Sequence, residues 1–211
     1  MKGIRDLART VGGIVTSPRM TLDGLASDAY ALAKGVAVLS VVSAVYVAIL
    51  LAFIGRGYPA AAPSILPIAA DEQYAIQVWY QVPLFFGATA VTAGVLVLLS
   101  RAAGRPAPGG LAFARVSLAT AVPFGLTTMI VESVLAIVLL LGAVAPRDAL
   151  DWLTGRGAWF ATLYQVVGLA WLVALLALSV SVTTRWGASR CLLGTAMLAL
   201  VYGAPVALLI R

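Results

Sequence analysis

The sequence contains no histidine and only one cysteine, Cys191, among its 211 residues. Histidine is the usual general base, proton shuttle and imidazole metal ligand, so those roles have no residue to fill them. A single cysteine excludes an intramolecular disulfide and a cysteine metal cluster. Glycine-rich phosphate loops, metal-ligand spacings and nucleophile elbows are also missing. We therefore expect a protein that is not an enzyme and that has no catalytic residues, metal ligands or cofactor.

Charge is equally scarce. Charged residues make up 10% of the chain and hydrophobic residues 62%, and the mean hydropathy is +1.03. Soluble domains are roughly 25% charged and 45–50% apolar. A soluble chain could not cover so much apolar surface with 14 basic and 8 acidic residues. The net charge of +6 does not indicate nucleic-acid binding, because the basic residues flank apolar runs and form no stripe. The composition predicts an integral membrane protein.

Five apolar runs are long enough to cross a bilayer as helices, for which about 20 residues are needed. They cover residues 35–54, 82–100, 116–144, 159–182 and 191–210. We predict an all-α fold, a bundle of five transmembrane helices over 35–211, behind a cytoplasmic lead of residues 1–34. A cleaved signal peptide is the competing interpretation of the first run. That run is longer than a signal h-region of roughly 7–15 residues and starts farther from the N-terminus, so we interpret it as a retained span.

The distribution of basic residues predicts the orientation, because cytoplasmic loops are enriched in lysine and arginine. With the N-terminus inside, ten basic residues fall inside and four outside. The inner set is Lys2, Arg5, Arg9, Arg19, Lys34, Arg101, Arg105, Arg115, Arg185 and Arg190, and the outer set is Arg56, Arg147, Arg156 and Arg211. An odd number of spans then places the C-terminus outside.

The lead before the first span has the pattern of a basic amphipathic helix. Apolar residues recur at helical spacing, and Lys2, Arg5 and Arg9 lie mostly elsewhere around the helix. Such a helix lies flat on an anionic leaflet. It could be a simple anchoring collar or a docking surface for a cytoplasmic partner. Ser17-Pro18 indicates an N-cap followed by the first turn of a second helix.

Glu132 is the one ionisable side chain well inside an apolar run. A carboxylate at membrane depth costs a few kcal/mol or more, so it must be neutral, paired or beside water. Pro123 is expected to kink this span, and Thr128 lies one turn from Glu132 on the same face. Two interpretations stay open. A protonated Glu132 bonds to a threonine or a backbone carbonyl, or it recognises an ion, a lipid headgroup or a partner.

Two further patterns bear on packing. Seven aromatic residues near the predicted outer ends of spans indicate an interfacial aromatic belt. They are Tyr58, Tyr74, Trp79, Tyr80, Trp152, Trp159 and Tyr164. Small residues at every fourth position indicate faces for close helix packing, within the bundle or in a homo-oligomer. They are Ser40, Ala44, Ala48 and Ala52 in the first span, Ser117, Ala121 and Gly125 in the third, and Ala199, Gly203 and Ala207 in the fifth.

Several of these features together resemble the Yip1 family of five-span membrane proteins. The segments that carry the resemblance are TSPRMTL (16–22), a short glycine-rich inner loop, and GLAFARVSLATAVPFGL (110–126), with Pro123 inside the third span. The resemblance implies membrane organisation or scaffolding, with the lipid bilayer and other membrane proteins as partners. The alanine, glycine and arginine content suggests a bacterial gene and the inner membrane. Alternatives are a small transporter or channel using Glu132, and an accessory subunit of a larger inner-membrane complex.

Overall fold

The computed structural model describes residues 2–60 and 68–210, and it describes side chains for 3–60 and 68–207. The side chain of Lys2 and all of Arg211 lie outside the described residues. Within the described ranges the chain is all-helical, as predicted. The elements in order are α1 (Lys2–Thr16), α2 (Pro18–Gly24), η1 (Leu25–Ser27), α3 (Ala31–Gly55), α4 (Gln73–Ala102), α5 (Gly109–Phe124), η2 (Gly125–Met129), α6 (Ile130–Leu140), α7 (Pro146–Thr154), α8 (Ala158–Thr184) and α9 (Ala188–Ile210).

Five helices in the described chain are long and apolar enough to cross a membrane. They are α3, α4, the continuous rod α5–η2–α6 (Gly109–Leu140), α8 and α9. The number five agrees with the sequence prediction, but the bounds differ. The helices begin before the apolar runs, and the third rod ends at Leu140, short of the predicted 144. The largest difference is at α4, which begins at Gln73 rather than near 82. Gln73, Gln77 and Gln81 occupy successive turns of one helix face and are all buried, so this polar stretch is helix and not loop.

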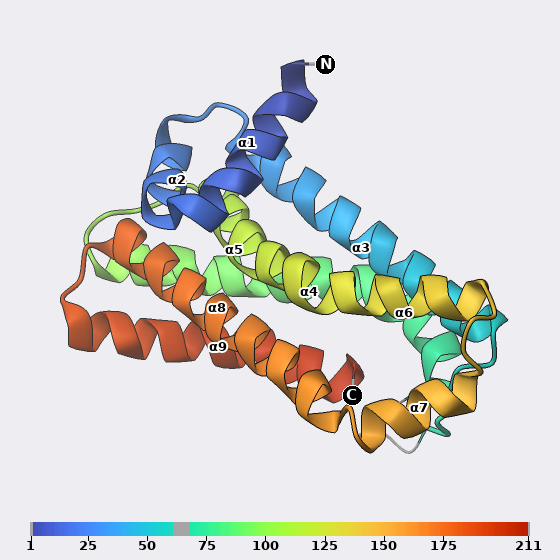
Figure 1. The fold of residues 1–211 in the computed structure, drawn as a ribbon. Helices are drawn as coiled ribbons and strands as arrows, with labels where there is room; N and C mark the ends of the chain where they lie inside the picture. The colour runs from blue at the N-terminus through green and yellow to red at the C-terminus, as the bar shows by residue number, and fades with distance from the viewer. Residues whose placement is uncertain (1, 61–67, 211) are drawn as a thin grey trace.

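The third of these rods is not a regular α-helix throughout. Pro123 lies inside α5, and the five residues Gly125–Met129 form a π-helical turn directly after it. Proline cannot donate a backbone hydrogen bond, and π turns interrupt a helix where its bonding ladder is disturbed. Figure 1 shows the rod changing direction between α5 and α6, as the sequence predicted for Pro123.

Helix α4 lies in the middle of the bundle and contacts α3, α5 and α9, while α8 packs on α5 and α9. The closest backbone approach joins α3 and α5. A Cβ atom placed on Gly35 would lie 2.7 Å from the Cα atom of Ala114. Small residues at such a contact let two helices approach without a side chain between them. The small residues Ser117 and Ala121 of α5 are buried in the same way.

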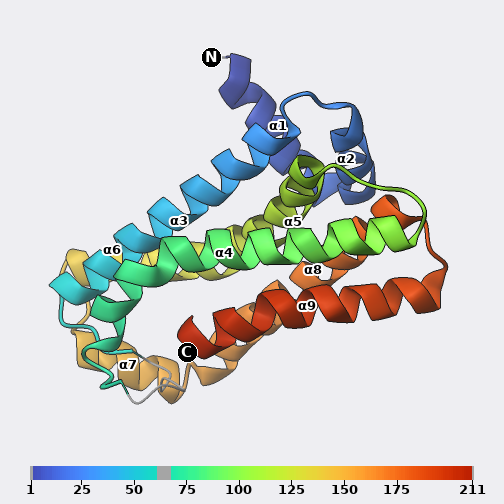
Figure 2. The same cartoon turned by 180° about the vertical axis from the view of Figure 1, so that it is seen from behind.

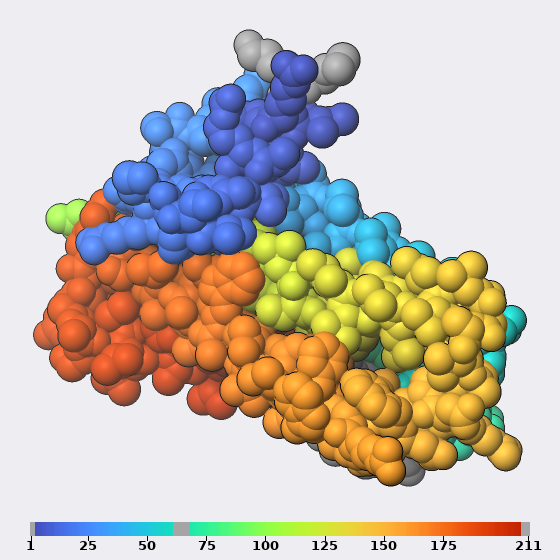
Figure 3. Space-filling view, viewed as in Figure 1, coloured from blue at the N-terminus to red at the C-terminus, as the bar shows by residue number. Residues whose placement is uncertain are grey.

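The short helices lie at opposite ends of the bundle. Helices α1 and α2 cover one end, where α3 begins and α8 ends, and α7 lies at the other (Figures 1 and 2). We call these the α1/α2 end and the α7 end. Helix α1 runs across the bundle rather than along it, whereas α9 runs from the α1/α2 end toward the α7 end. In Figure 3 the atoms of α1 and α2 lie against those of α3, α5 and α8.

The aromatic belt predicted from the sequence is only partly present. Trp79 and Trp159 are 84% and 67% exposed, as expected of interfacial residues. Tyr58, in contrast, is only 4% exposed and packs against Phe53, with ring centroids 5.0 Å apart. Tyr74 also stacks in this group, 6.5 Å from Tyr58. Proximity to a span end therefore did not distinguish surface aromatics from aromatics that close the bundle.

Most of the small-residue face of the first span does not pack inside the bundle. Ser40, Ala44 and Ala48 of α3 are exposed, whereas Ala52 is half-buried and packs against the core. The buried face of α3 is the opposite one, which carries Gly35 and Tyr46. We interpreted faces of small residues as surfaces for packing within the bundle or in a homo-oligomer. Packing within the bundle is therefore wrong for Ser40, Ala44 and Ala48.

Candidate functional site

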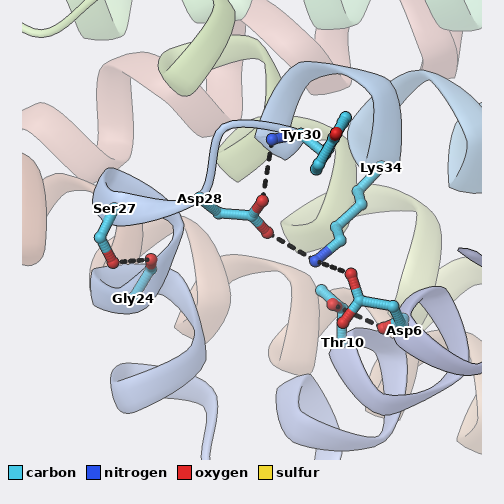
Figure 4. A network of polar contacts seen from close by, with 7 residues as sticks. All are labelled: Asp6, Thr10, Gly24, Ser27, Asp28, Tyr30 and Lys34. Atoms are coloured by element: carbon cyan, nitrogen blue, oxygen red, sulfur yellow. Dashed lines mark hydrogen bonds and ion pairs between the residues drawn. The ribbon is translucent and has the colours of Figure 1, made fainter. Parts of the chain in front are cut away.

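Lys34, in the first turn of α3, holds the N-terminal helices in place. Its Nζ atom lies 2.5 Å from Oδ2 of Asp28 and 2.6 Å from Oδ2 of Asp6 (Figure 4). Asp6 belongs to α1, and Asp28 follows η1, so a single ammonium joins three consecutive parts of the chain. The side chain of Lys34 is only 12% exposed. Partial burial weakens solvent screening and makes such a pair stronger than one on an open surface.

Asp28 is the better-defined partner of Lys34. Its Oδ1 atom accepts a 2.8 Å hydrogen bond from the backbone N–H of Tyr30 while Oδ2 faces the ammonium. The hydrogen bond from Lys34 and that from Tyr30 both favour the charged form and lower the pKa of Asp28 below its usual value. The carboxylate therefore stays ionised over a wider pH range than an ordinary aspartate.

Arg115 makes a second connection at this end. Its side chain is 3% exposed, although the sequence placed it just before the third span as an ordinary cytoplasmic charge. Nε donates to the carbonyl oxygen of Leu22 at 2.9 Å, and Nη1 donates to the hydroxyl of Thr183 at 2.9 Å. One guanidinium thereby joins α2, α5 and α8. No described carboxylate lies within ion-pair distance of Arg115, so its charge is held by neutral oxygens.

A surface ion pair continues this connection. Nη2 of Arg185 lies 2.7 Å from Oδ1 of Asp23, and both side chains are nearly half exposed. Exposed pairs of this kind contribute about 0–1 kcal/mol. Arg185 ends α8 in the left-handed conformation, with φ of 57°, which non-glycine residues rarely adopt. The Asp23–Arg185 ion pair therefore adds little to the free energy of unfolding. It joins α2 to the residue at which α8 ends.

Helix α1 has the two-faced character predicted for it. Ile14 is fully buried and Val11 is half-buried, whereas Arg5 and Arg9 are exposed. Ile4, near the start of α1, is 76% exposed although it is apolar. Beneath α1 an open groove of about 240 Å³ is lined only by apolar side chains of α1, α3, α5 and η2. The α1/α2 end of the bundle thus presents apolar surface next to exposed arginines.

Glu132 belongs to a separate polar group, which we call the Glu132 cluster: Glu132, Tyr46, Tyr58, Tyr74, Tyr164 and Gln77. The carboxyl of Glu132 lies within electrostatic range of the hydroxyls of Tyr46 and Tyr58, which also sense Tyr164. Tyr46 hydrogen-bonds to the side chain of Gln77, and Gln77 donates from Nε2 to Oε1 of Gln81 at 3.0 Å. Helices α3, α4, α6 and α8 and the segment that follows α3 therefore bring oxygen- and nitrogen-bearing side chains together around one acid.

Tyr58, which lies in the segment between α3 and α4, is the member of this cluster whose pKa is perturbed outside the long helices. Burial raises the pKa of Tyr58 to about 12, with the nearby Tyr164 and Glu132 adding to the effect. Its hydroxyl stays protonated at every physiological pH. Tyr58 can therefore donate a hydrogen bond toward the cluster but cannot act as a base there.

The π turn lies directly before Glu132 and is fixed by α8. The hydroxyl of Thr127 donates to the carbonyl of Pro123 at 2.8 Å, and a Cβ atom on Gly168 would lie 2.5 Å from that hydroxyl oxygen. Thr127 thus bonds within the turn, while Thr128, suggested by the sequence as a partner of Glu132, lies in the same π turn and is half-buried. Of the residues predicted here, Pro123 and Glu132 flank the π turn, and no sequence pattern indicated Tyr46 or Gln77.

Among the described residues, His, Cys, Asp and Glu form no group of three or more that could hold a metal ion. Comparison with known proteins finds no matching family model, no matching curated protein and no matching solved structure.

Proposed function

We propose that this chain is a multi-pass membrane protein without catalytic activity, which acts in membrane organisation or as a scaffold for other membrane proteins. The observation that carries the proposal is the placement of α1. It runs across one end of five long apolar helices and is tied there by Lys34, with Arg5 and Arg9 exposed. A helix held in this way would lie in the plane of an anionic leaflet and present a fixed surface at its headgroups.

The charges at the two ends support an orientation. Arg19, Arg101, Arg105 and Arg190 lie near the α1/α2 end with its tied helices, in exposed positions. Together with the bias of basic residues along the sequence, this favours a cytoplasmic α1/α2 end and a C-terminus on the opposite side. We propose the bacterial inner membrane as the location, from the composition of the chain.

Kinship with the Yip1 family is part of the proposal and rests on the residues that carry the resemblance. The segment 16–22 covers the end of α1 and most of α2. The segment 110–126 covers nearly all of α5 and the start of the π turn. Arg115 joins these two segments through the Leu22 carbonyl. The two stretches that carry the resemblance thus contact each other, which is the arrangement expected if they form one conserved unit of the fold.

The position of α1 is tested with spin labels on the full-length protein in vesicles containing anionic lipid. With Cys191→Ser as background, Ile4→Cys and Arg9→Cys place labels on the apolar and charged faces of α1. We expect the label at 4 to be accessible to oxygen dissolved in lipid and the label at 9 to be accessible to a water-soluble nickel chelate. Equal exposure of both labels to the chelate would contradict an interfacial helix.

The scaffold role is tested by purification from native membranes in mild detergent, followed by mass spectrometry. We expect membrane-protein companions with the wild type and their loss in Lys34→Met, which releases α1. Recovery of the chain alone would remove support for both the scaffold role and the accessory-subunit alternative. Companions that stay bound to Lys34→Met would favour an accessory subunit held through the helical bundle.

A small transporter or channel is a second candidate, and the Glu132 cluster is the observation that favours it. A partly buried acid among tyrosine and glutamine side chains is a typical site for a proton or a small cation in a membrane protein. In proteoliposomes, Glu132→Gln should abolish pH-driven flux if this function is present. Glu72→Gln, at an exposed position outside the apolar spans, is the matched control. Equal flux through wild type and Glu132→Gln would exclude this candidate.

A further inference from the structure

Four buried serine and threonine hydroxyls have no hydrogen-bond partner in the described chain, and the buried hydroxyl of Tyr58, in the Glu132 cluster, has none either. The four belong to Ser43 of α3, Thr89 and Thr92 of α4, and Ser117 of α5. Ser43 is 1% exposed and the other three are fully buried. Buried polar groups in proteins are almost always hydrogen-bonded, and those without a protein partner are commonly satisfied by ordered water.

These hydroxyls differ from other buried hydroxyls of the bundle, in α5, α8 and α9. Thr120, Ser179, Thr184 and Thr195 all donate to the backbone carbonyl four residues earlier, at distances of 2.8–2.9 Å. That local bond is the usual way in which a helical serine or threonine is satisfied away from water. The four exceptional hydroxyls make no such bond.

On α4, Thr89 and Thr92 share a face with Phe85, one and two turns closer to the α1/α2 end. Phe85 contacts Tyr46 of α3 and Phe124 of α5, with ring centroids 6.2 and 5.3 Å apart. This face of α4 is therefore the one turned toward α3 and α5. Both threonine hydroxyls lie where the three helices meet.

The serines approach the same place from the other two helices. Ser43 lies one turn from Tyr46 on α3, toward the α1/α2 end. Ser117 lies on α5 between Phe113 and Phe124, both of which contact aromatic rings of α4. Helical spacing places Ser117 on the same face of α5 as these two rings, which is a face turned toward α4. Residues 43, 89, 92 and 117 thus form one group at the α3–α4–α5 junction, which we call the hydroxyl seam.

We propose that the hydroxyl seam binds water molecules inside the bundle. Each hydroxyl offers one donor and two acceptor positions, and a buried water needs two to four such partners. Ala88 and Ala93, which flank the threonines on α4, contribute little side-chain volume to the junction. Without water the group would contain four unsatisfied hydroxyls in an apolar interior, each of which costs free energy. This inference does not depend on the proposed scaffold function.

The hydroxyl seam lies on the opposite side of an aromatic layer from the Glu132 cluster. The layer consists of the rings of Phe85, Phe124 and Tyr46, which contact one another at 5.1–6.2 Å, and the hydroxyl of Tyr46 belongs to the Glu132 cluster on its far side. On the Glu132 side, Nε2 of Gln81 is also buried without a partner. Polar groups therefore occupy both sides of the layer. Water bound in the seam places a hydrated segment in the part of the long helices, toward the α1/α2 end, that carries no acidic side chain.

Water-edited solid-state NMR on threonine-labelled protein in liposomes tests the proposal. At short mixing times we expect the Cβ signals of Thr89 and Thr92 to receive at least twice the water-derived intensity of Thr195. Thr195 is the matched dry control, since it is buried and bonded to the Cys191 carbonyl. Exposed Thr154 is the wet reference. Equal, low intensity at Thr89, Thr92 and Thr195 would overturn the proposal.

A stability series gives an independent measurement. Thr89→Val and Thr92→Val keep the side-chain shape and remove the hydroxyl, and Thr195→Val is the control. If water satisfies the hydroxyls, removing them breaks existing hydrogen bonds, and the Tm should fall in each seam variant. A rise in Tm for both variants means that the hydroxyls were dry and unsatisfied, which contradicts the proposal. A seam variant that does not fold has lost stability, as the proposal expects. In that case the NMR signals of the wild type decide whether the hydroxyls are hydrated.

Discussion

The guanidinium of Arg115 donates to the carbonyl of Leu22, 93 residues earlier in the chain, and so fixes α2 to the bundle. The same group donates to the hydroxyl of Thr183. Only arginine presents several donors in a fixed planar arrangement, so lysine cannot reach both acceptors at once.

Arg115→Lys should therefore destabilise the protein by about 2–3 kcal/mol, because at least one bond from a charged donor is lost in a buried place. Thermal unfolding in detergent, followed by tryptophan fluorescence, measures the effect. The control is Arg105→Lys, an exposed substitution at the same end, which should stay within about 0.5 kcal/mol. Equal unfolding temperatures for the two variants would show that Arg115 does not hold α2.

Lys34→Met should release α1 without unfolding the bundle. The substitution removes the ammonium shared by Asp6 and Asp28 and keeps most of the side-chain length. We expect a loss of about 1 kcal/mol in the local opening free energy, or roughly fivefold faster amide exchange in α1. Hydrogen exchange with mass spectrometry measures it, and Arg105→Met is the control. Unchanged exchange in α1 would show that the Lys34 ion pairs do not hold α1 against the bundle.

Acid should loosen the same attachment. The pKa of Asp28 is lowered in the folded protein, so its carboxylate stabilises the fold above the ordinary aspartate pKa, about 3.9, and this contribution is lost as the pH falls through the lowered value. The protection of the α1 amides, taken relative to the intrinsic exchange rate at each pH, should fall below about pH 4 and be independent of pH between about 5 and 8. Asp28→Asn should remove this acid-dependent step. A step that persists in Asp28→Asn belongs to another group.

Gly35 is required where α3 and α5 meet. A Cβ atom there would collide with the backbone of Ala114, which cannot move aside as a flexible side chain would. Gly35→Ala should cost about 1–3 kcal/mol or more through overpacking. Gly94→Ala, where an added Cβ meets nothing within 4 Å, should be neutral or gain up to about 1 kcal/mol. Thermal unfolding of the pair separates the clash from the general effect of replacing a helical glycine.

Hydropathy and periodicity predicted the number of long helices and the amphipathic character of α1, because both depend on local sequence. They did not predict that α4 begins at Gln73, since three glutamines look like a loop until a neighbouring helix covers them. Arg115 was misjudged for the same reason. Its acceptors at Leu22 and Thr183 come from distant parts of the chain, and no local pattern reveals them.

The acid of the third span shows the same limit. Its position in an apolar run marked Glu132 as unusual, and that much needed only the sequence. The tyrosines that face it were interpreted as surface aromatics, because distance along the chain does not tell which side of a helix faces inward. The π turn was also unexpected, although Pro123 indicated an irregular helix at this place.

The crossing of a membrane by α3, α4 and the α5–α6 rod, and with it the orientation of the bundle, is tested most directly by cysteine labelling in intact cells. Cys191→Ser provides a background without cysteine, in which Ser27→Cys places a thiol at the α1/α2 end and Thr154→Cys one at the α7 end. A maleimide that does not cross membranes should label position 154 from outside, and position 27 only after the cells are opened. Labelling of both positions from the same side would contradict the proposed topology.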